Sequence, residues 1–476
     1  MDRARMTINV QETFNALPPV WPEDLLPAIR REIDARPLSL VVLDDDPTGT
    51  QTVYDVPVLT GWEVRTLVDE FNRRTPLFYV LTNSRSTPQA QAVELAREIG
   101  ANIFEASRQT GRAFEVISRS DSTLRGHFPA EVDALADVLE IRQAVTLVIP
   151  FFEEGGRYTI GDVHYVKEGN DLVPAAQTPF AADAVFGYRH SDLKEWVEEK
   201  TRGRVPASSV RSLTIDDIRL KGPDCVASRI TECAPGTVCI VNSADYRDIE
   251  VVVLGLLRAE HENVRFLFRT AASFVRVRGG LRARPLLTAE EILSTCEGGG
   301  LVVVGSHVPR SSEQLFDLLD NAYVCDIELS VRGILASKSR DKEIGKTVEF
   351  ADSALSKGKD VAIYTSRELV TGDDDVGSLS IGAAVSQALV RIVSSISVRP
   401  RYIVAKGGIT SSDIATQALE IRRAQVLGQI LPGVPVWRCG LESRFPNLPY
   451  VVFPGNVGST DAISTVVRTL RKPEDW

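Results

Sequence analysis

Residues 41–50, VVLDDDPTGT, join the end of an apolar run to three consecutive aspartates and a turn. The apolar part is typical of a buried β-strand, and the PTG at 47–49 has residue types that favour a turn. Adjacent carboxylates repel one another, so the aspartates at 44–46 are unfavourable here unless another group uses their charge. We therefore treat them as candidate functional residues.

Two kinds of chemistry could use these aspartates. Asp44-x-Asp46-x-Thr48 fits the D-x-D-x-T pattern of haloacid-dehalogenase-like phosphatases, in which the first aspartate becomes phosphorylated. Such an enzyme needs a second acidic pair, and TGDDD at 371–375 could imitate it. Alternatively, a pair of carboxylates binds and deprotonates a polyol. The aspartates could also serve only the turn, because Asp is common there.

Composition excludes several classes of protein. The chain has 476 residues and a net charge of −10, which disfavours general binding to nucleic acid or to an anionic membrane surface. Six cysteines show no C-x-x-C spacing, and the longest apolar runs are too short for a membrane helix. The N-terminus lacks the apolar core of a signal peptide. We expect a cytoplasmic protein with reduced thiols.

Short apolar runs alternate with helical patterns, which favours an α/β fold with parallel sheets. The expected strands are 38–44, 77–83, 113–120, 144–150, 237–243, 264–270, 301–306, 361–366, 401–408 and 450–456. Helices are expected at 87–106 and 413–425, and residues 153–195 read as a long, irregular, lid-like connection.

The pattern weakens at 275–298, which contains two glycine clusters and a proline, so we place a domain boundary there. We predict an N-terminal arm at 1–36, a substrate-binding α/β domain at 37–280 and a nucleotide-binding α/β domain at 281–476. Each domain is expected to contain a largely parallel sheet covered by helices, with the active site in the inter-domain cleft.

Polar residues follow four expected strands of the first half, where open α/β sheets bind ligands. The candidates are Asp45, Asp46, Thr48, Asn83, Ser84, Arg85, Arg119, Asp121, Ser122, Arg125 and Arg157. Arginine can bind a carboxylate through two hydrogen bonds, and the carboxylates and hydroxyls can bind hydroxyl groups. This mixture indicates a small sugar acid as the ligand.

Three strand-to-helix loops of the second half are rich in glycine, serine and threonine: 305–315, 405–415 and 453–463. Glycines let backbone N–H groups approach an anion, so we predict a nucleotide site. No Walker A or G-x-G-x-x-G pattern is found. The candidates are Ser306, Gly407, Gly408, Ile409, Thr410, Ser411, Gly455, Asn456 and Gly458.

The ordered motifs DDPTG, SDSTLRG, the GR at 156–157, KGGITS and PGNVG resemble those of the four-carbon acid sugar kinase family, from about residue 38 to the C-terminus. The resemblance implies an ATP-dependent kinase that phosphorylates the terminal hydroxyl of an acid such as threonate, erythronate or an oxo form. It implies acid contacts at Asp45, Asp46, Arg85, Asp121, Ser122, Arg125 and Arg157. It also implies ATP contacts at Ser306, Gly407, Gly408, Thr410, Gly455 and Gly458.

We expect ATP and Mg²⁺ as cofactors and Asp45 or Asp46 as the catalytic residue that accepts the hydroxyl proton. Arg125, with Arg85 or Arg119, would hold the carboxylate.

The chain departs from the family pattern at three places. Gln51-Thr52-Val53 follows the DDPTG motif where the family usually has an acidic residue, Arg119-Ser120 stands where a lysine often precedes DSTLRG, and Ile409 replaces a glutamate. The metal ligands and the identity of the acid therefore stay unassigned. A relative that binds metabolites without turnover is a further alternative. The expected partners are the acid and ATP, without nucleic acid or membrane, and the sheet edges are compatible with a homodimer.

Overall fold

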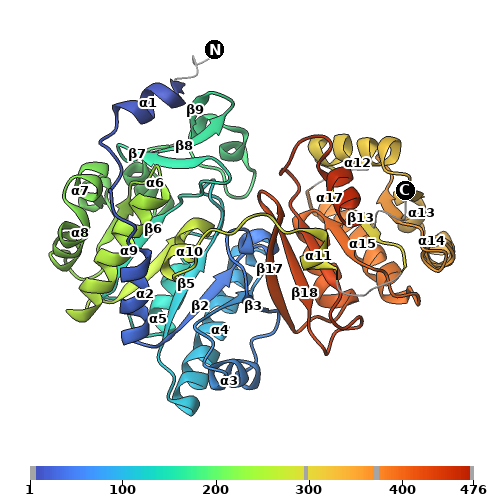
Figure 1. Ribbon diagram of the computed structural model, residues 1–476, viewed down its shortest axis with the longest axis horizontal. Helices are drawn as coiled ribbons and strands as arrows, with labels where there is room; N and C mark the ends of the chain where they lie inside the picture. The colour runs from blue at the N-terminus through green and yellow to red at the C-terminus, as the bar shows by residue number, and fades with distance from the viewer. Residues whose placement is uncertain (1–6, 294–297, 368–374, 472–476) are drawn as a thin grey trace. The chain divides into compact units, whose positions relative to one another are not determined.

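The structure, a computed structural model, describes residues 7–293, 298–367 and 375–471. The chain forms two compact units, of which the first is coloured from blue to yellow-green and the second, apart from the blue segment Val53–Thr60, from yellow to red (Figure 1). Unit 1 comprises Met1–Thr52 and Gly61–Ala283, and unit 2 comprises Val53–Thr60 and Arg284–Trp476. The predicted two-domain α/β class with mostly parallel sheets is confirmed. The boundaries at 36/37 and 280/281 stay predictions.

Unit 1 contains a parallel sheet with the strand order β10-β11-β6-β12-β5-β2-β4. The central strand β2 is buried along its whole length, as expected for a parallel strand covered on both faces. The strands are β2 (Ser39–Asp44), β4 (Leu77–Leu81), β5 (Phe114–Arg119), β6 (Val145–Ile149), β10 (Arg211–Leu213), β11 (Val238–Val241) and β12 (Phe266–Thr270).

The helices of unit 1 pack in two sets, α3 with α4 and α5, and α2, α7, α8 and α10 around α9. Helix α9 has an aspartate N-cap, Asp245, and an apolar face that lies in the core. The helices are α1 (Val10–Ala16), α2 (Leu26–Ala35), α3 (Val64–Asn72), α4 (Gln89–Thr110), α5 (Ala130–Val138), α6 (Leu193–Lys200), α7 (Ile215–Arg219), α8 (Gly222–Thr231), α9 (Tyr246–His261) and α10 (Ala272–Arg278).

The connection at 153–195 is more regular than predicted. It contains three strands, β7 (Arg157–Ile160), β8 (Val163–Glu168) and β9 (Asp171–Pro174), in a small antiparallel sheet that β1 (Ile8–Asn9) completes (Figure 1). Gly161 and Asp162 turn the chain between β7 and β8 with positive φ angles. The prediction of a long irregular connection was therefore wrong for this part.

Unit 2 contains a mixed sheet with the order β3-β17-β18-β19-β16-β13-β15-β14. The strands from β19 to β14 are parallel, whereas β3, β17 and β18 add an antiparallel part. The strands are β3 (Val56–Leu59), β13 (Leu301–Val304), β14 (Cys325–Leu329), β15 (Val361–Thr365), β16 (Ile403–Lys406), β17 (Arg423–Leu431), β18 (Val434–Cys439) and β19 (Pro449–Phe453).

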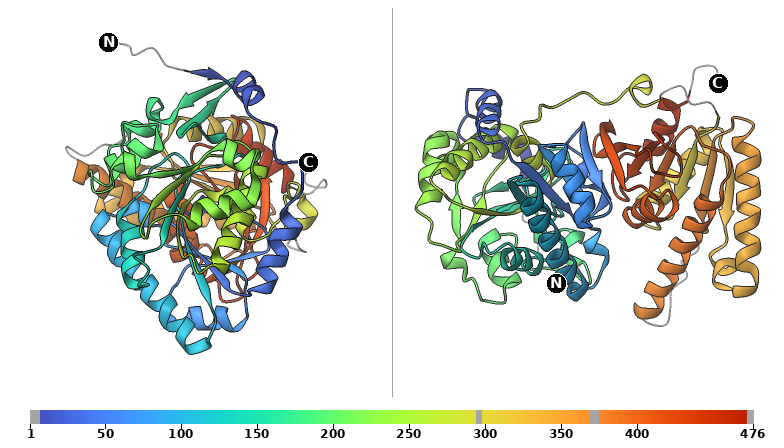
Figure 2. Two further views of the ribbon diagram at one scale, coloured as in Figure 1. Left: turned by 90° about the vertical axis from the view of Figure 1, so that its left-hand side faces the viewer. Right: turned by 90° about the horizontal axis from the view of Figure 1, so that it is seen from below.

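The helices of unit 2 lie mostly in the connections between its parallel strands (Figure 2). They are α11 (Ala289–Ile292), α12 (Pro309–Asn321), α13 (Val331–Leu335), α14 (Ser337–Leu355), α15 (Asp375–Ser395), α16 (Gly408–Asp413) and α17 (Ala462–Thr469).

The predicted helix at 413–425 was right up to Ala418 and wrong beyond it. Helix α16 continues into a π-helical turn, Ile414–Ala418, and Glu420 then takes a positive φ of 52°. Strand β17 follows, and its residues alternate between partly exposed and buried positions, which is the pattern of a strand with one covered face. The two-residue period of RAQVLGQIL therefore decides the structure over the helix-forming residues before it.

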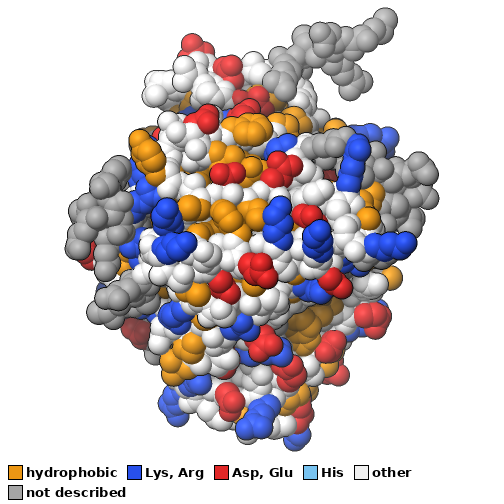
Figure 3. Space-filling model, turned by 90° about the vertical axis from the view of Figure 1, so that its right-hand side faces the viewer, with side chains coloured by type: hydrophobic (Ala, Val, Ile, Leu, Met, Phe, Trp, Pro, Cys, Tyr) orange, Lys and Arg blue, Asp and Glu red, His pale blue; other side chains and the backbone are white. Residues whose placement is uncertain are grey.

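No described helix is long and apolar enough to cross a bilayer. On the face shown in Figure 3, basic and acidic side chains are interspersed with apolar ones wherever residues are described.

Candidate active site

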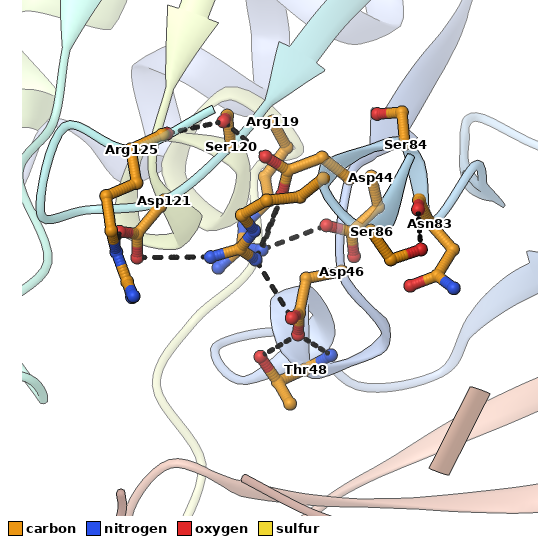
Figure 4. Close-up of polar contacts among 12 residues, drawn as sticks. Asp44, Asp46, Thr48, Asn83, Ser84, Ser86, Arg119, Ser120, Asp121 and Arg125 are labelled. Carbon is orange, nitrogen blue, oxygen red and sulfur yellow. Dashed lines mark hydrogen bonds and ion pairs between the residues drawn. The ribbon is translucent and has the colours of Figure 1, made fainter. Parts of the chain in front are cut away.

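The carboxyl ends of three adjacent strands, β4, β2 and β5, bring the first set of predicted residues together (Figure 4). Asp44 is the last residue of β2, and Arg119 is the last residue of β5. Asn83 and the short 3₁₀ helix Ser84–Ser86 follow β4. Since these strands are parallel, their following loops meet at one edge of the sheet, as the sequence predicts.

Arg85 lies at the centre of this cluster. Its Nη2 atom is 3.1 Å from Asp45 Oδ1 and 3.0 Å from Asp46 Oδ2, and its Nη1 atom is 3.4 Å from Asp121 Oδ1. Burial disfavours the charge of Arg85, but Asp45, Asp46 and Asp121 outweigh it and raise the pKa of Arg85 above its usual range. This guanidinium therefore neutralises the carboxylates that the sequence places side by side.

Asp44 and Arg119 form a buried ion pair, and Arg119 Nη1 also lies 3.8 Å from Asp45 Oδ1. Arg119 Nη1 donates to Asp44 Oδ1 at 2.9 Å. Burial raises the pKa of Asp44 to about 7, and the neighbouring carboxylates act in the same direction against the charge of Arg119. A Cβ atom on Gly49 would lie 2.0 Å from Asp44 Oδ2, so the turn needs glycine to pack over this carboxylate.

Asp45 and Asp46 differ in their access to solvent. Both oxygens of Asp45 are bound, one by Arg85 and the other by Ser120 Oγ at 2.5 Å, and the side chain is 4% exposed. Asp46 accepts two hydrogen bonds from Thr48, through the backbone N–H at 2.9 Å and Oγ1 at 2.5 Å, yet its side chain is 22% exposed. Burial opposes the charge of Asp46, but Arg85 and Thr48 lower its pKa overall.

Asp121 and Arg125 come from the loop after β5. Arg125 Nε donates to Asp121 Oδ2 at 2.7 Å, and Thr123 Oγ1 donates to the same oxygen. Burial opposes the charge of Asp121, but Arg125, Arg85 and Thr123 together hold the pKa of Asp121 well below its usual range. Arg125 Nη1 also lies 3.7 Å from Asp183 Oδ2.

The remaining predicted residues lie around the cluster in different ways. Asn83 has a left-handed backbone, and its carbonyl accepts from Ser86 Oγ (Figure 4). Ser84 is buried and lies 3.2 Å from Thr82 Oγ1, while the carbonyl of Ser122 is bound by His164 Nε2. Arg157 begins β7, outside the parallel sheet.

Two charged residues of the cluster were missed by the sequence analysis. Arg269 lies in β12, beside β5, and its Nη2 atom donates to the carbonyl of Arg125 at 2.8 Å. Burial lowers the pKa of Arg269 to about 10. Glu131, in the first turn of α5, hydrogen-bonds with Ser84, and burial followed by the charge of Asp45 raises its pKa to about 7.

The three glycine-rich loops of unit 2 also meet. They follow β13, β16 and β19, and these strands are neighbours in the sheet. Ser311 Oγ donates to Ser306 Oγ at 3.0 Å and lies 3.1 Å from the carbonyl oxygen of Gly455, which joins the first and third loops. A Cβ atom on Gly407 would lie 3.0 Å from the Cβ atom of Ser306, so the first and second loops are in close contact.

The predicted nucleotide contacts in these loops differ in their roles. Ser411 Oγ donates to the carbonyl of Ala405 at 2.7 Å and is buried, so it stabilises the loop. Thr410 packs closely against Gly305, because a Cβ atom on Gly305 would lie only 2.4 Å from Thr410 Oγ1. The apolar side chain of Ile409 is 57% exposed. Gly408 begins α16, Asn456 is exposed, and Gly458 has a φ angle of 89°.

Two cations lie beside these loops, and the sequence analysis named neither. Lys406 Nζ donates to the carbonyl of Pro454 at 2.6 Å and lies 4.1 Å from the ring centre of Phe453. Burial lowers the pKa of Lys406 to about 7. Arg367, directly after β15, donates to the carbonyl of Ser306 at 2.7 Å. Its position after a predicted strand was the signal that could have identified it.

The described residues include no group of three or more His, Cys, Asp or Glu side chains that could hold a metal ion. Mg²⁺ keeps several waters and binds through one or two carboxylates and the phosphates of a substrate in kinases, so it needs no such group. Of the segment TGDDD at 371–375, which could imitate the second acidic pair of a phosphatase, residues 371–374 lie outside the described residues, and Asp375 begins α15.

Comparison with family models places both halves of the chain. A sugar-binding N-terminal domain matches residues 40–278, and a nucleotide-binding C-terminal domain matches residues 301–463. The chain belongs to the four-carbon acid sugar kinase family. The family predicted from the ordered motifs is therefore confirmed, with its kinase class and nucleotide-binding domain.

Curated members of the sugar kinase family match along most of their length. A D-erythronate kinase from Heliobacterium modesticaldum is 22% identical over 91% of this chain and 97% of its own. A 3-oxo-tetronate kinase from Pseudomonas savastanoi is 26% identical over 82% of this chain and 86% of its own. A D-threonate kinase from Bordetella bronchiseptica is 23% identical over 90% of this chain and 97% of its own.

Solved structures support the fold of this sugar kinase family. A Salmonella typhimurium LT2 protein has a TM-score of 0.66 at 16% identity and covers 90% of this chain and 98% of its own. A Haemophilus influenzae protein has a TM-score of 0.62 at 16% identity and covers 90% of this chain and 100% of its own.

Proposed function

We propose that the protein transfers the γ-phosphoryl group of ATP to the terminal hydroxyl of a four-carbon sugar acid. The observation that carries this proposal is the cluster of arginines and aspartates at the ends of β2, β4 and β5, in a chain whose relatives are named kinases of erythronate, threonate and 3-oxo-tetronate. Arginines suit the carboxylate of such an acid, and aspartates suit its hydroxyls.

Arg125 is one candidate for binding the acid carboxylate. Its guanidinium is partly exposed, whereas Arg119 is occupied by Asp44 and Arg85 by three aspartates. The predicted substrate contacts of Arg119 and Arg85 stay predictions. In this assignment Arg85 keeps the aspartates charged and in place, and Arg125 provides hydrogen bonds to the ligand.

Asp46 is the better placed of the two predicted catalytic residues. Both oxygens of each aspartate are contacted, but the side chain of Asp46 is 22% exposed and that of Asp45 is 4% exposed, so a substrate hydroxyl can approach Asp46 more easily. We propose that Asp46 accepts the proton of the terminal hydroxyl while the oxygen of that hydroxyl attacks the phosphorus atom. Asp45 then holds Arg85 and Ser120 in position.

The three glycine-rich loops of unit 2 are assigned to the ATP phosphates. Their backbone N–H groups and the hydroxyls of Ser306 and Thr410 offer donors without a carboxylate side chain at position 409. Mg²⁺ bound to the phosphates would neutralise their charge during transfer. The predicted inter-domain cleft, homodimer and cytoplasmic location stay predictions.

The phosphatase alternative is disfavoured by the environment of Asp44. A nucleophilic aspartate must reach a phosphorus atom, but Asp44 is 2% exposed in its side chain and paired with Arg119. The alternative of a family member that binds metabolites without turnover is tested by the same experiment as the kinase.

The test is incubation with ATP and a panel of D-erythronate, D-threonate and their 3-oxo forms, with ADP release measured and the product identified by mass spectrometry and ³¹P NMR. The proposal requires ADP release that depends on the acid, with phosphate on its terminal oxygen. Binding of an acid without ADP release would instead indicate a non-catalytic relative. Phosphate release from a phosphorylated acid without ATP would indicate a phosphatase.

A further inference from the structure

The ring of Phe180 lies against two guanidinium groups. The Cζ atoms of Arg125 and Arg157 are 5.1 Å and 5.5 Å from its ring centre. The face of an aromatic ring carries partial negative charge, so it attracts both cations and offsets part of the repulsion between them. One side chain thus contacts two arginines that the sequence assigns to the acid.

The two arginines differ in how their charges are balanced. Arg125 has Asp121 at 2.7 Å and Asp183 at 3.7 Å. Within the described part of the chain, Arg157 forms no ion pair, and its buried Nε atom has no hydrogen-bond partner. Burial lowers the pKa of Arg157. The charge of Asp121 raises it in part, and the charge of Arg125 lowers it further.

A guanidinium whose Nε is buried and that has no anion beside it is costly, because the charge has lost water there and gained no negative partner. An incoming carboxylate would supply the missing negative charge and could accept two hydrogen bonds from the N–H groups of Arg157. Arg157 is therefore the arginine of the site with the most to gain from an anionic ligand.

Phe180 is held in place by the loop that carries Asp121 and Arg125. It belongs to the 3₁₀ turn Pro179–Ala182, and Thr178 Oγ1 donates to the carbonyl of Ala175 at 2.7 Å. Tyr188, which ends this segment, donates through its hydroxyl to the carbonyl of Thr123 at 2.8 Å. Hydrogen bonds thus flank the turn that carries Phe180, and the one from Tyr188 joins its segment to the loop of Arg125.

We infer that Phe180 determines specificity for a carboxylate, because it orients the unpaired guanidinium of Arg157 toward the acid group of the substrate. This inference deepens the proposed function and rests on it for the identity of the acid. The ligand class is a small hydroxy acid with an ionised carboxylate, and a neutral polyol or amide of the same shape would gain nothing from Phe180.

The experiment compares D-erythronate with D-erythronamide, which replaces the carboxylate by a neutral group of similar size. Binding of each to the full-length protein is measured by calorimetry without nucleotide, for the wild type and for Phe180→Leu. We expect the Kd of D-erythronate to rise about tenfold in Phe180→Leu and that of D-erythronamide to stay within about twofold. Phe180→Tyr, which keeps the ring, should bind both like the wild type.

Phe186→Leu is the matched control, because Phe186 lies in the same segment but makes an edge-to-face contact with His127 and has no ring contact with a described arginine. It should bind both ligands like the wild type. If Phe180→Leu does not fold, Phe180→Met keeps most of the volume without the ring and gives the same comparison. Equal weakening of both ligands, or no change in either, would overturn the inference.

The readout separates this inference from the proposed function. Wild-type protein that binds D-erythronate but releases no ADP contradicts the kinase and leaves the calorimetric comparison intact. Wild-type protein that turns D-erythronate over, with Phe180→Leu unchanged in binding, contradicts the role of Phe180 alone. Wild-type protein with no greater affinity for D-erythronate than for D-erythronamide contradicts the carboxylate site.

Discussion

Arg119 Nη1 lies 2.9 Å from Asp44 Oδ1, and the two side chains are 5% and 2% exposed. The two residues are register partners at the ends of the adjacent parallel strands β2 and β5. Because the first aspartate of the triplet is buried with its counter-charge, the three aspartates have different tasks. Asp44 stabilises the strand end, whereas Asp45 and Asp46 contact Arg85.

Asp44→Asn should therefore act on stability more than on chemistry. The amide keeps the shape but leaves Arg119 buried without its nearest anion, and removing one partner of a buried pair costs about 3–5 kcal/mol. We expect a loss of unfolding free energy on that scale in urea denaturation, with kcat of the folded fraction reduced less than tenfold. Loss of all turnover in a variant of wild-type stability would contradict this role.

Asp46→Asn should remove the proton acceptor. We expect kcat to fall by about 10²–10⁴-fold, the usual contribution of a general base, with the Kd of the acid little changed. Asp45→Asn is the comparison, because it disturbs Arg85 and Ser120 and should weaken acid binding as well as kcat. If Asp45→Asn alone loses kcat at constant acid affinity, the base is Asp45.

Gly407→Ala should weaken ATP binding selectively. The backbone at Gly407 has a φ of 112°, and the added Cβ atom would lie 3.0 Å from Ser306, so the first two glycine-rich loops must separate. We expect the KM for ATP to rise at least about tenfold, with acid binding measured alone unchanged. Gly358→Ala is the control for a positive backbone φ, since Gly358 has a φ of 71° but no described atom lies within 4 Å of its Cβ position.

A rise in the KM for ATP that Gly358→Ala reproduces would show an effect of stability, not of the loops. An unchanged KM in folded Gly407→Ala would place the nucleotide elsewhere.

The strand ends were predictable from the sequence because a buried parallel strand is a continuous apolar run, and the polar residues after it are easily seen. Asp45, Arg85 and Asp121 therefore meet as predicted. Arg269 was missed because it lies inside an apolar run, where a single arginine gives no periodic signal. Its partner is the backbone carbonyl of Arg125, and the sequence does not indicate this hydrogen bond.

The antiparallel part of unit 2 was missed for a different reason. Residues 413–425 contain good helix formers, and tertiary pairing of β17 with β18 and β3 outweighs their propensity. The contact of Phe180 with two arginines was also unpredictable, because it joins residues 55 and 23 positions apart through a segment without a regular pattern. Pairings of this kind depend on the fold and not on local sequence.

Glu131 should make stability depend on pH. Its folded pKa of about 7 lies above the value near 4.5 expected in the unfolded chain, so the folded state binds the proton more tightly between these values. The stabilisation from this group is thus complete below about pH 4.5 and is lost as pH rises through about 7, at up to about 1.4 kcal/mol per pH unit.

Glu131→Gln cannot ionise and lacks this dependence. The unfolding free energy of the wild type minus that of Glu131→Gln should therefore fall from pH 5 to pH 8 in urea denaturation. Glu140→Gln, which removes an exposed carboxylate just after the same helix, should show a nearly constant difference. A constant difference for Glu131→Gln as well would mean that Glu131 is ionised in the folded protein throughout this range, and that Asp45 and burial do not perturb it.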